Sequence, residues 1–202
     1  MTYDLGIIGV GKLGSALGRL ALDAGLDVAV ADDPSRPLLE LVVGSVLPGA
    51  HLVDAAALLA SSAVVILAVP QPVVAGLPLA QAGDAVVVDA TNAWEATDGV
   101  RADGPTTAAL AARHPELRLV KTLNHFAYAD LLADARPSGA PGRRAVAVAG
   151  DDADAVAQVA AVVDALGFDP VGVGMDSAEL LEPGGPVFGR VLTASDLRAA
   201  LA

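Results

Sequence analysis

A glycine-rich loop near the start of the chain has the spacing that binds a pyrophosphate. Gly9-Val10-Gly11-Lys12-Leu13-Gly14 forms a GxGxxG pattern between an apolar, strand-like segment and a helix-like one. In such a loop the first glycine permits a tight turn, the second lets the backbone approach the phosphates, and the third lets the helix pack on the strand. The amino-terminal end of the helix adds free N–H groups and a partial positive charge. The loop therefore predicts a bound dinucleotide.

An acidic residue follows the second predicted strand, where a dinucleotide fold places the adenosine ribose. Asp32 lies eighteen residues after Gly14, and its carboxylate would accept hydrogen bonds from the ribose and repel a 2′-phosphate, which favours NAD over NADP. Ser35 and Arg36 follow it, and these side chains would instead suit a 2′-phosphate. The alternative for Asp32 is an ordinary turn acid, and we interpret Asp33 as a helix cap.

The other binding candidates follow predicted strands whose carboxyl ends should meet at one edge of a parallel sheet, where ligands bind. Val69 and Pro70, after Ala68, would form an apolar wall beneath the nicotinamide ribose. Asn92 can offer both a donor and an acceptor to a carboxamide or a hydroxyl. The alternatives are a proline that ends a buried strand and an asparagine that caps a helix or a turn.

His125 is the candidate for acid–base chemistry, because it follows a predicted strand and is the histidine expected at the mouth of the site. There it would hydrogen-bond a substrate oxygen or move a proton, although a structural role for a loop histidine is equally open. Trp94 and Phe126 could form an apolar surface for a second ring or pack in the core. We expect His51 and His114 to face solvent.

The elements that must position these residues alternate along the chain between short apolar runs and helical patterns. This pattern predicts a Rossmann-type α/β fold: a doubly wound, mainly parallel sheet with a small C-terminal αβ extension. The expected strands cover residues 5–8, 28–31, 51–53, 63–69, 85–89, 117–121, 145–149 and 168–173. The expected helices cover residues 13–24, 106–113, 129–133 and 152–166, with another beginning after Asp33-Pro34. Residues 136–144, rich in proline and glycine, divide a dinucleotide-binding domain, 1–140, from a smaller unit, 141–202.

The composition excludes several classes of protein. Of the 202 residues, 54% are hydrophobic, which excludes general disorder. The net charge of −12 argues against a surface for nucleic acid or anionic membrane. The chain has no cysteine, so disulfides and thiolate chemistry are excluded, and its three histidines are too scattered to predict a zinc cluster. With neither a signal peptide nor a membrane-spanning run in the sequence, we expect a cytoplasmic protein.

Several short motifs, in their order and spacing, resemble one family. They are Gly6–Gly14, Leu67–Pro70, Asp89–Asn92, Val120–His125, Ala147–Asp152, Leu166–Pro170 and Leu181–Gly184. Over nearly its whole length the chain resembles the NADP oxidoreductases that depend on coenzyme F420, a deazaflavin. The resemblance implies hydride exchange between a reduced deazaflavin and a nicotinamide, and a homodimer. Members with that activity carry a serine-arginine pair for the 2′-phosphate directly after the second strand, whereas Asp32, Asp33 and Pro34 stand here.

Hydride transfer between two flat rings needs the reacting carbons held about 3 to 3.5 Å apart and little acid–base assistance. From the glycine-rich loop together with this resemblance, we expect an oxidoreductase that transfers a hydride between a nicotinamide dinucleotide, NAD or NADP, and coenzyme F420 or a flavin. One alternative is an NAD(P)-dependent dehydrogenase or imine reductase of a small metabolite. Another is a sensor module that binds NAD(P)(H) without turnover. All three take small-molecule cofactors as partners.

Overall fold

The computed structural model describes residues 2–92 and 106–201 of the chain. Its centre is an eight-stranded sheet with the order β3-β2-β1-β4-β5-β6-β7-β8. The strands are β1 (Tyr3–Ile8), β2 (Val28–Ala31), β3 (His51–Leu52), β4 (Ser62–Leu67), β5 (Val86–Asp89), β6 (Arg118–Lys121), β7 (Ala145–Ala149) and β8 (Asp169–Val173). Neighbouring strands are parallel except β6 and β7, which confirms the predicted Rossmann-type, mainly parallel sheet.

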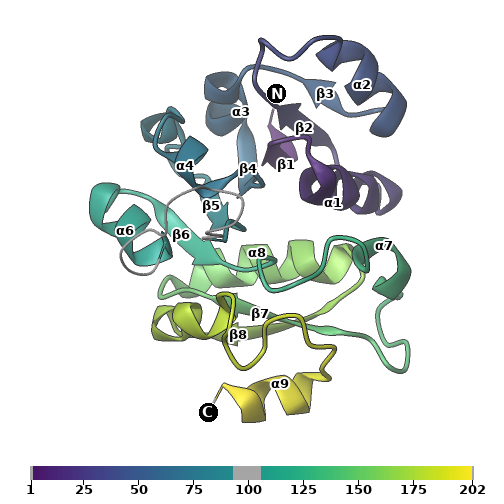
Figure 1. The fold of residues 1–202 in the computed structure, drawn as a ribbon, viewed down its shortest axis with the longest axis vertical. Helices are drawn as coiled ribbons and strands as arrows, with labels where there is room; N and C mark the ends of the chain where they lie inside the picture. The colour runs from purple at the N-terminus through teal and green to yellow at the C-terminus, as the bar shows by residue number, and fades with distance from the viewer. Residues whose placement is uncertain (1, 93–105, 202) are drawn as a thin grey trace.

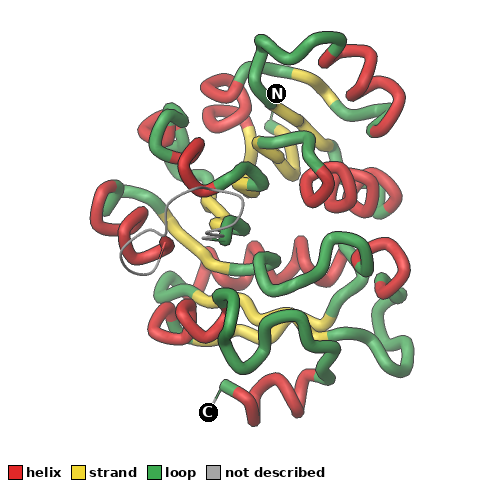
Figure 2. Tube along the Cα trace, viewed as in Figure 1, coloured by secondary structure: helices red, strands yellow, loops and turns green. Residues whose placement is uncertain are grey.

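Helices cover both faces of this sheet (Figures 1 and 2). They are α1 (Lys12–Asp23), α2 (Leu39–Val46), α3 (Ala55–Ser61), α4 (Gln71–Val74), α6 (Thr106–Arg113), α7 (Leu131–Asp134), α8 (Ala153–Ala165) and α9 (Ala194–Ala200), with 3₁₀ turns η1 (Leu79–Gln81) and η2 (Met175–Leu181). One apolar core packs α1, α2 and α8 against the sheet, and a second packs α3, η1 and α6 against the other face. The sheet is therefore doubly wound, as predicted.

The inner strands are apolar along their length because both of their faces are covered. Every residue of β2, β5 and β7 is buried. The strand order changes direction between β1 and β4, and a crevice opens at the carboxyl ends of strands at such a point. The fold therefore places the glycine-rich loop, which follows β1, at the edge of this crevice.

The segment after β2 differs from the prediction. Asp33 does not cap a helix, because its Oδ1 accepts the N–H of Ser35 at 2.8 Å in a turn, and α2 begins only at Leu39. A short acidic side chain followed by proline suits an Asx turn as well as a helix start, so the local pattern did not separate the two. The helices α3, α4 and α9 were also missed.

The C-terminal unit continues the same sheet. Its strands β7 and β8 are parallel to each other, and β7 joins β6 through one antiparallel pair, Lys121 with Ala149. A third apolar core lies under these two strands, between them and α9. The domain division at residue 140 stays a prediction. Among the described residues, no helix is long and apolar enough to cross a membrane.

Candidate functional site

The three motif glycines meet different surroundings. Gly9 has a φ of 105°, and a Cβ on it would lie 2.4 Å from the carbonyl oxygen of Ala68. A Cβ on Gly14 would lie 1.9 Å from the carbonyl oxygen of Gly9, so the close approach of α1 to the loop requires a glycine there. A Cβ on Gly11 would meet no atom within 4 Å. The fold itself therefore needs Gly9 and Gly14, whereas Gly11 leaves its backbone open to the crevice.

The amino-terminal end of α1 is open to an anion. Its first residue is Lys12, Gly11 provides no side-chain cap, and the first turn contains no acidic residue. The N–H groups of this turn therefore keep their positive partial charge for a phosphate. The Lys12 Nζ lies 3.1 Å from the Tyr128 hydroxyl and 5.1 Å from the centre of that ring, which adds a full positive charge at the loop.

The glycine-rich loop can be tested without disturbing the fold. We expect Gly11→Val to change the free energy of unfolding by no more than about 1 kcal/mol, because Gly11 has extended backbone angles and open space around it. The same change should raise the Kd of NADH and NADPH at least about tenfold, because the side chain would fill the path of the pyrophosphate. Calorimetric titration measures this. Gly44→Ala, at another glycine with open space around it, is the control and should leave both Kd values unchanged. If Gly11→Val also leaves the Kd values unchanged, the dinucleotide does not bind at this loop.

Asp32 fixes the loop and borders a pocket on the β2 side of the sheet. Its Oδ2 accepts the N–H of Val10 at 2.7 Å and forms an ion pair with Arg36, and its Oδ1 accepts the N–H of Asp33 at 2.7 Å. The Asp32 side chain is 13% exposed, whereas Arg36 is 42% exposed. Both line a pocket of about 850 Å³ whose other walls are mainly apolar residues of 38–41, 52–56 and Pro78. Ser35 lies in the same turn, exposed at the surface.

A second pocket, of about 570 Å³, lies at the carboxyl ends of the central strands. Its lining consists of Leu13, Ala68, Val69, Pro70, Ala90, Thr91, Asn92, Asn124, Phe126, Ala127, Tyr128, Phe188 and Gly189. The structure thus brings together five predicted site residues from three separate motifs, namely Leu13, Ala68, Val69, Pro70 and Asn92. The surface is mainly apolar, as a wall for a ring should be. The predicted contribution of Trp94 lies outside the described residues.

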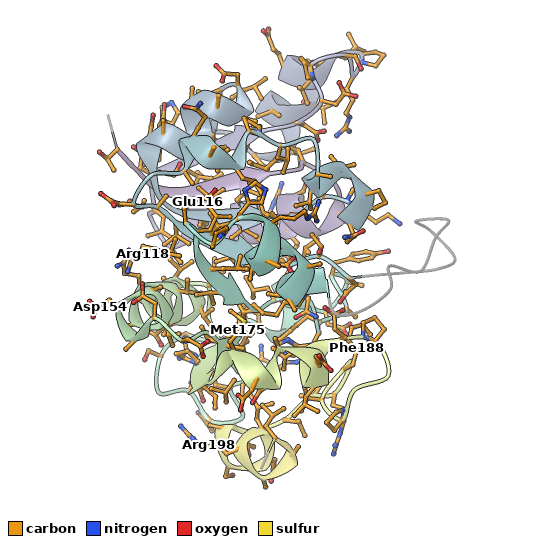
Figure 3. All side chains as sticks on the ribbon, turned by 90° about the vertical axis from the view of Figure 1, so that its left-hand side faces the viewer. Glu116, Arg118, Asp154, Met175, Phe188 and Arg198 are labelled. Atoms are coloured by element: carbon orange, nitrogen blue, oxygen red, sulfur yellow. The ribbon has the colours of Figure 1, made fainter. Side chains whose placement is uncertain are left out.

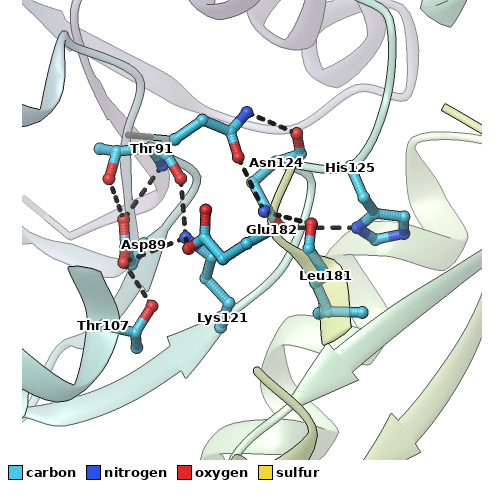
Figure 4. A network of polar contacts seen from close by, with 9 residues as sticks. Asp89, Thr91, Thr107, Lys121, Asn124, His125, Leu181 and Glu182 are labelled. Carbon is cyan, nitrogen blue, oxygen red and sulfur yellow. Dashed lines mark hydrogen bonds and ion pairs between the residues drawn. The ribbon is translucent and has the colours of Figure 1, made fainter. Parts of the chain in front are cut away.

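Asn92 is held by a reciprocal pair of hydrogen bonds. Its Nδ2 donates to the carbonyl oxygen of Asn124 at 2.7 Å, and its Oδ1 accepts from the Asn124 Nδ2 at 3.0 Å. The same Nδ2 of Asn124 donates to the carbonyl oxygen of Leu181 at 2.8 Å (Figure 4). The pair joins the segments that follow the neighbouring strands β5 and β6 and fixes the orientation of Asn92, which keeps one N–H and one lone pair for a ligand.

The structure corrects the expected position of His125. The residue is 2% exposed and does not line the pocket, and its ring meets the edge of Phe126 at 5.0 Å between centroids. Its Nε2 is buried with no hydrogen-bond partner. Burial, together with the positive charges of Arg144 and Lys121, lowers the pKa of His125 to about 3. The side chain is therefore neutral at pH 7 and stands behind the pocket wall. Spacing placed the loop correctly but could not predict which way the ring points.

A buried charge network lies beside the pocket, and the sequence reasoning missed it. Lys121 is fully buried, and its Nζ lies 2.7 Å from the carbonyl oxygen of Thr91, 3.3 Å from Asp89 Oδ2 and 2.8 Å from Glu182 Oε1 (Figure 4). Asp89 also accepts from the hydroxyls of Thr91 and Thr107, each at 2.7 Å. The network joins the ends of β5 and β6 to the segment after η2. The available signal was a lysine at the end of an apolar strand, because a buried charge needs a charged or polar partner.

Comparison with known proteins shows which proteins the chain is similar to. The model of a family described as NADP oxidoreductase, coenzyme F420-dependent, matches residues 4–93. No curated protein matches the chain. A solved structure of a hypothetical protein from Sinorhizobium meliloti is 30% identical, with 95% of each chain covered and a TM-score of 0.81.

Two further solved structures share the fold at lower identity. A candidate F420-dependent NADP-reductase from Arthrobacter sp. FB24 is 22% identical, with 89% of this chain and 90% of that chain covered and a TM-score of 0.73. An imine reductase from Myxococcus stipitatus, solved with NAD⁺, is 19% identical, with 100% of this chain but 60% of that chain covered and a TM-score of 0.64.

Proposed function

We propose that the chain is a member of the coenzyme F420-dependent NADP oxidoreductases and that it transfers a hydride between a nicotinamide dinucleotide and the planar ring of a deazaflavin or a flavin. One observation carries this proposal: the loop with the open helix end contacts both pockets, because Val10 donates to Asp32 of the first pocket and Leu13 lines the pocket at the strand ends. The dinucleotide would place its adenosine in the first pocket and its nicotinamide in the second. The nicotinamide supplies or accepts the hydride.

The pocket at the strand ends can position rings better than it can move protons. Among the described residues that line it, Tyr128 alone carries a titratable side chain. Val69 and Pro70 would support the nicotinamide ribose, and the amide of Asn92 would bind a carboxamide or hydroxyl through its remaining donor and acceptor. Such a site would hold two rings in contact, which is what hydride transfer between them requires.

A mixing experiment tests the proposal. The protein is combined with NADH or NADPH and with oxidised coenzyme F420 or flavin mononucleotide, and the nucleotide absorbance is followed. Consumption of the nucleotide in step with reduction of the ring supports hydride transfer to that ring. Turnover only with a small imine or carbonyl would instead support the metabolite reductase, and tight binding without turnover would support the sensor.

The metabolite reductase has one observation in its favour. Reduction of an imine or carbonyl needs a proton donor near the hydride acceptor, and the Tyr128 hydroxyl, bonded by Lys12, borders the pocket. This Lys–Tyr contact joins residues 116 positions apart, so the sequence alone did not predict it. The chain nevertheless spans only 60% of the similar imine reductase, which leaves that protein's activity a second candidate.

The choice between NAD and NADP should depend on Asp32. We expect NADH to bind about tenfold more tightly than NADPH, a difference of ~1.4 kcal/mol, because a 2′-phosphate would meet a carboxylate fixed by the N–H groups of Val10 and Asp33. Asp32→Ser should weaken NADH and strengthen NADPH in titrations with both nucleotides.

Two further variants separate charge from loop geometry in this experiment. Asp32→Asn keeps an acceptor for Val10 but removes the negative charge, so it should relieve the repulsion with little effect on the loop. Arg36→Ala should leave NADH binding nearly unchanged. The opposite result would be an unmodified protein that prefers NADPH and loses this preference in Arg36→Ala. In that case Arg36, together with Ser35, would bind a 2′-phosphate. The homodimer and the cytoplasmic location stay predictions.

A further inference from the structure

We propose that Phe188 determines the class of second substrate, by forming a fixed aromatic wall on which a planar heterocyclic ring stacks. The inference rests on the proposed function and deepens it, because it names the residue that would distinguish a flat ring from a small aliphatic imine or carbonyl. Phe188 and Gly189 line the strand-end pocket although they come from a segment far along the chain. Figure 3 labels Phe188 on this C-terminal segment.

The backbone before Phe188 is anchored to buried groups. Asn124 donates to the carbonyl oxygen of Leu181, and Glu182 forms an ion pair with the fully buried Lys121 at 2.8 Å. Val187, directly before Phe188, is 1% exposed and packs in the core under β7 and β8. The segment before Phe188 is therefore held in place where it reaches the pocket wall.

The turn that carries Phe188 is itself tight. The N–H of Gly185 donates to the carbonyl oxygen of Glu182 at 2.8 Å, and the N–H of Phe188 donates to that of Gly185 at 3.3 Å. A Cβ on Gly185 would lie 2.2 Å from the carbonyl oxygen of Leu180, so the turn requires glycine at that position. The path of the chain through this turn is therefore set by contacts other than those of the Phe188 ring.

The backbone after Phe188 is anchored as firmly. The N–H of Gly189 donates to the carbonyl oxygen of His125 at 2.9 Å, and Arg144 Nη2 donates to that of Arg190 at 2.9 Å. Arg144 is 2% exposed and its guanidinium lies 4.0 Å from the centre of the Phe126 ring, itself a residue of the pocket. The backbone on both sides of Phe188 is therefore anchored, and the half-buried Phe188 lies at the pocket wall.

An anchored aromatic wall suits a flat ring. Phe126, Tyr128 and Phe188 give the pocket three aromatic side chains, and a planar heterocycle gains from stacking on such a face. Because the flanking backbone is already ordered, little conformational entropy is lost when the ring binds. A small aliphatic imine would offer no π-face to Phe188. The geometry thus favours a deazaflavin or flavin ring over a small metabolite.

The test compares three replacements of Phe188 with a neighbouring control. Phe188→Leu keeps an apolar side chain without a π-face, Phe188→Ala removes the wall, and Phe188→Tyr restores an aromatic ring. Val191→Ala is the control, since Val191 is 67% exposed and does not line the pocket. For each protein we measure the KM of coenzyme F420 and of flavin mononucleotide, the Kd of NADH, and the Kd of flavin mononucleotide with NAD⁺ present.

Phe188→Leu and Phe188→Ala should raise the KM and the Kd of the ring about tenfold, while the Kd of NADH stays within about twofold. Phe188→Tyr and Val191→Ala should match the unmodified protein. If turnover is unaffected by Phe188→Leu and Phe188→Ala, the inference is overturned and the proposed function stands. Ring binding that depends on Phe188 without any turnover would overturn the proposed function alone, and failure of both rings to bind would overturn both.

Discussion

Replacing Lys121 with methionine should lower the free energy of unfolding by about 3 to 5 kcal/mol at pH 7. Methionine has a similar length and no charge, so it would fill the space of the lysine but leave the carboxylates of Asp89 and Glu182 without their cation. Asp89 is 1% exposed, and its remaining partners are hydroxyls and the N–H of Thr91. Urea denaturation followed by circular dichroism measures the loss.

The chain offers a matched control, because it contains one other lysine. Lys12→Met removes an exposed contact with the Tyr128 hydroxyl, and we expect it to change the free energy of unfolding by about 0.5 kcal/mol or less. A loss below about 1 kcal/mol for Lys121→Met would contradict a network shielded from water. The double variant Lys121→Met, Glu182→Leu should recover part of the lost free energy of unfolding. Two apolar side chains in contact cost less than a buried carboxylate without its cation.

The elements predicted most closely from the sequence are those whose burial leaves little choice of residue. The expected strands at 28–31 and 145–149 coincide with β2 and β7. The two strands are covered on both faces, which requires short, uninterrupted apolar runs. By contrast, α3 was missed because it is mostly alanine and leucine, with little periodicity. The available signal was its N-cap, Asp54, whose Oδ1 accepts the N–H of Ala57.

Much of the candidate site could be predicted because glycine spacing and strand ends are local features. The loop at 9–14 and the strand-end residues Ala68–Pro70 and Asn92 all border the crevice. The contacts between distant segments could not be predicted, including Lys12 with Tyr128 and Lys121 with Glu182. Each depends on how the loop after β6 and the segment after η2 come together, which no spacing within a motif encodes.

The position of the loop that contains His125 was predicted correctly, but the direction of the His125 side chain was not, because it depends on one unusual backbone angle. Leu123, two residues earlier, has a φ of 64°, a left-handed conformation that is uncommon for leucine. Directly after this turn, Asn124 and His125 are both buried. The sequence shows a polar loop after a strand, which is typical of ligand contacts, but the side-chain directions depend on a conformation that leucine rarely adopts.

Burial of neutral His125 should make the protein less stable in mild acid. In the unfolded chain the histidine has a pKa of about 6.5, whereas in the folded protein its pKa is about 3. Between these values the unfolded state binds a proton that the folded state does not, so the free energy of unfolding falls as the pH drops. Above about pH 6.5 His125 is neutral in both states and causes no loss of stability. Between pH 7 and pH 5 we expect the free energy of unfolding to fall by about 2 kcal/mol.

The slope of stability against pH, rather than the stability itself, tests this prediction, because any replacement of a buried residue can destabilise the fold. His125→Asn removes the titrating group and should flatten the slope between pH 7 and pH 5. His51→Asn is the matched control: His51 is half exposed beside Asp27, so its removal should leave the steep slope in place. Equal slopes in the unmodified protein and His125→Asn would mean that the histidine binds its proton in the folded state. An imidazolium would then form behind the pocket wall in mild acid, and the lowered pKa of the folded state would be wrong.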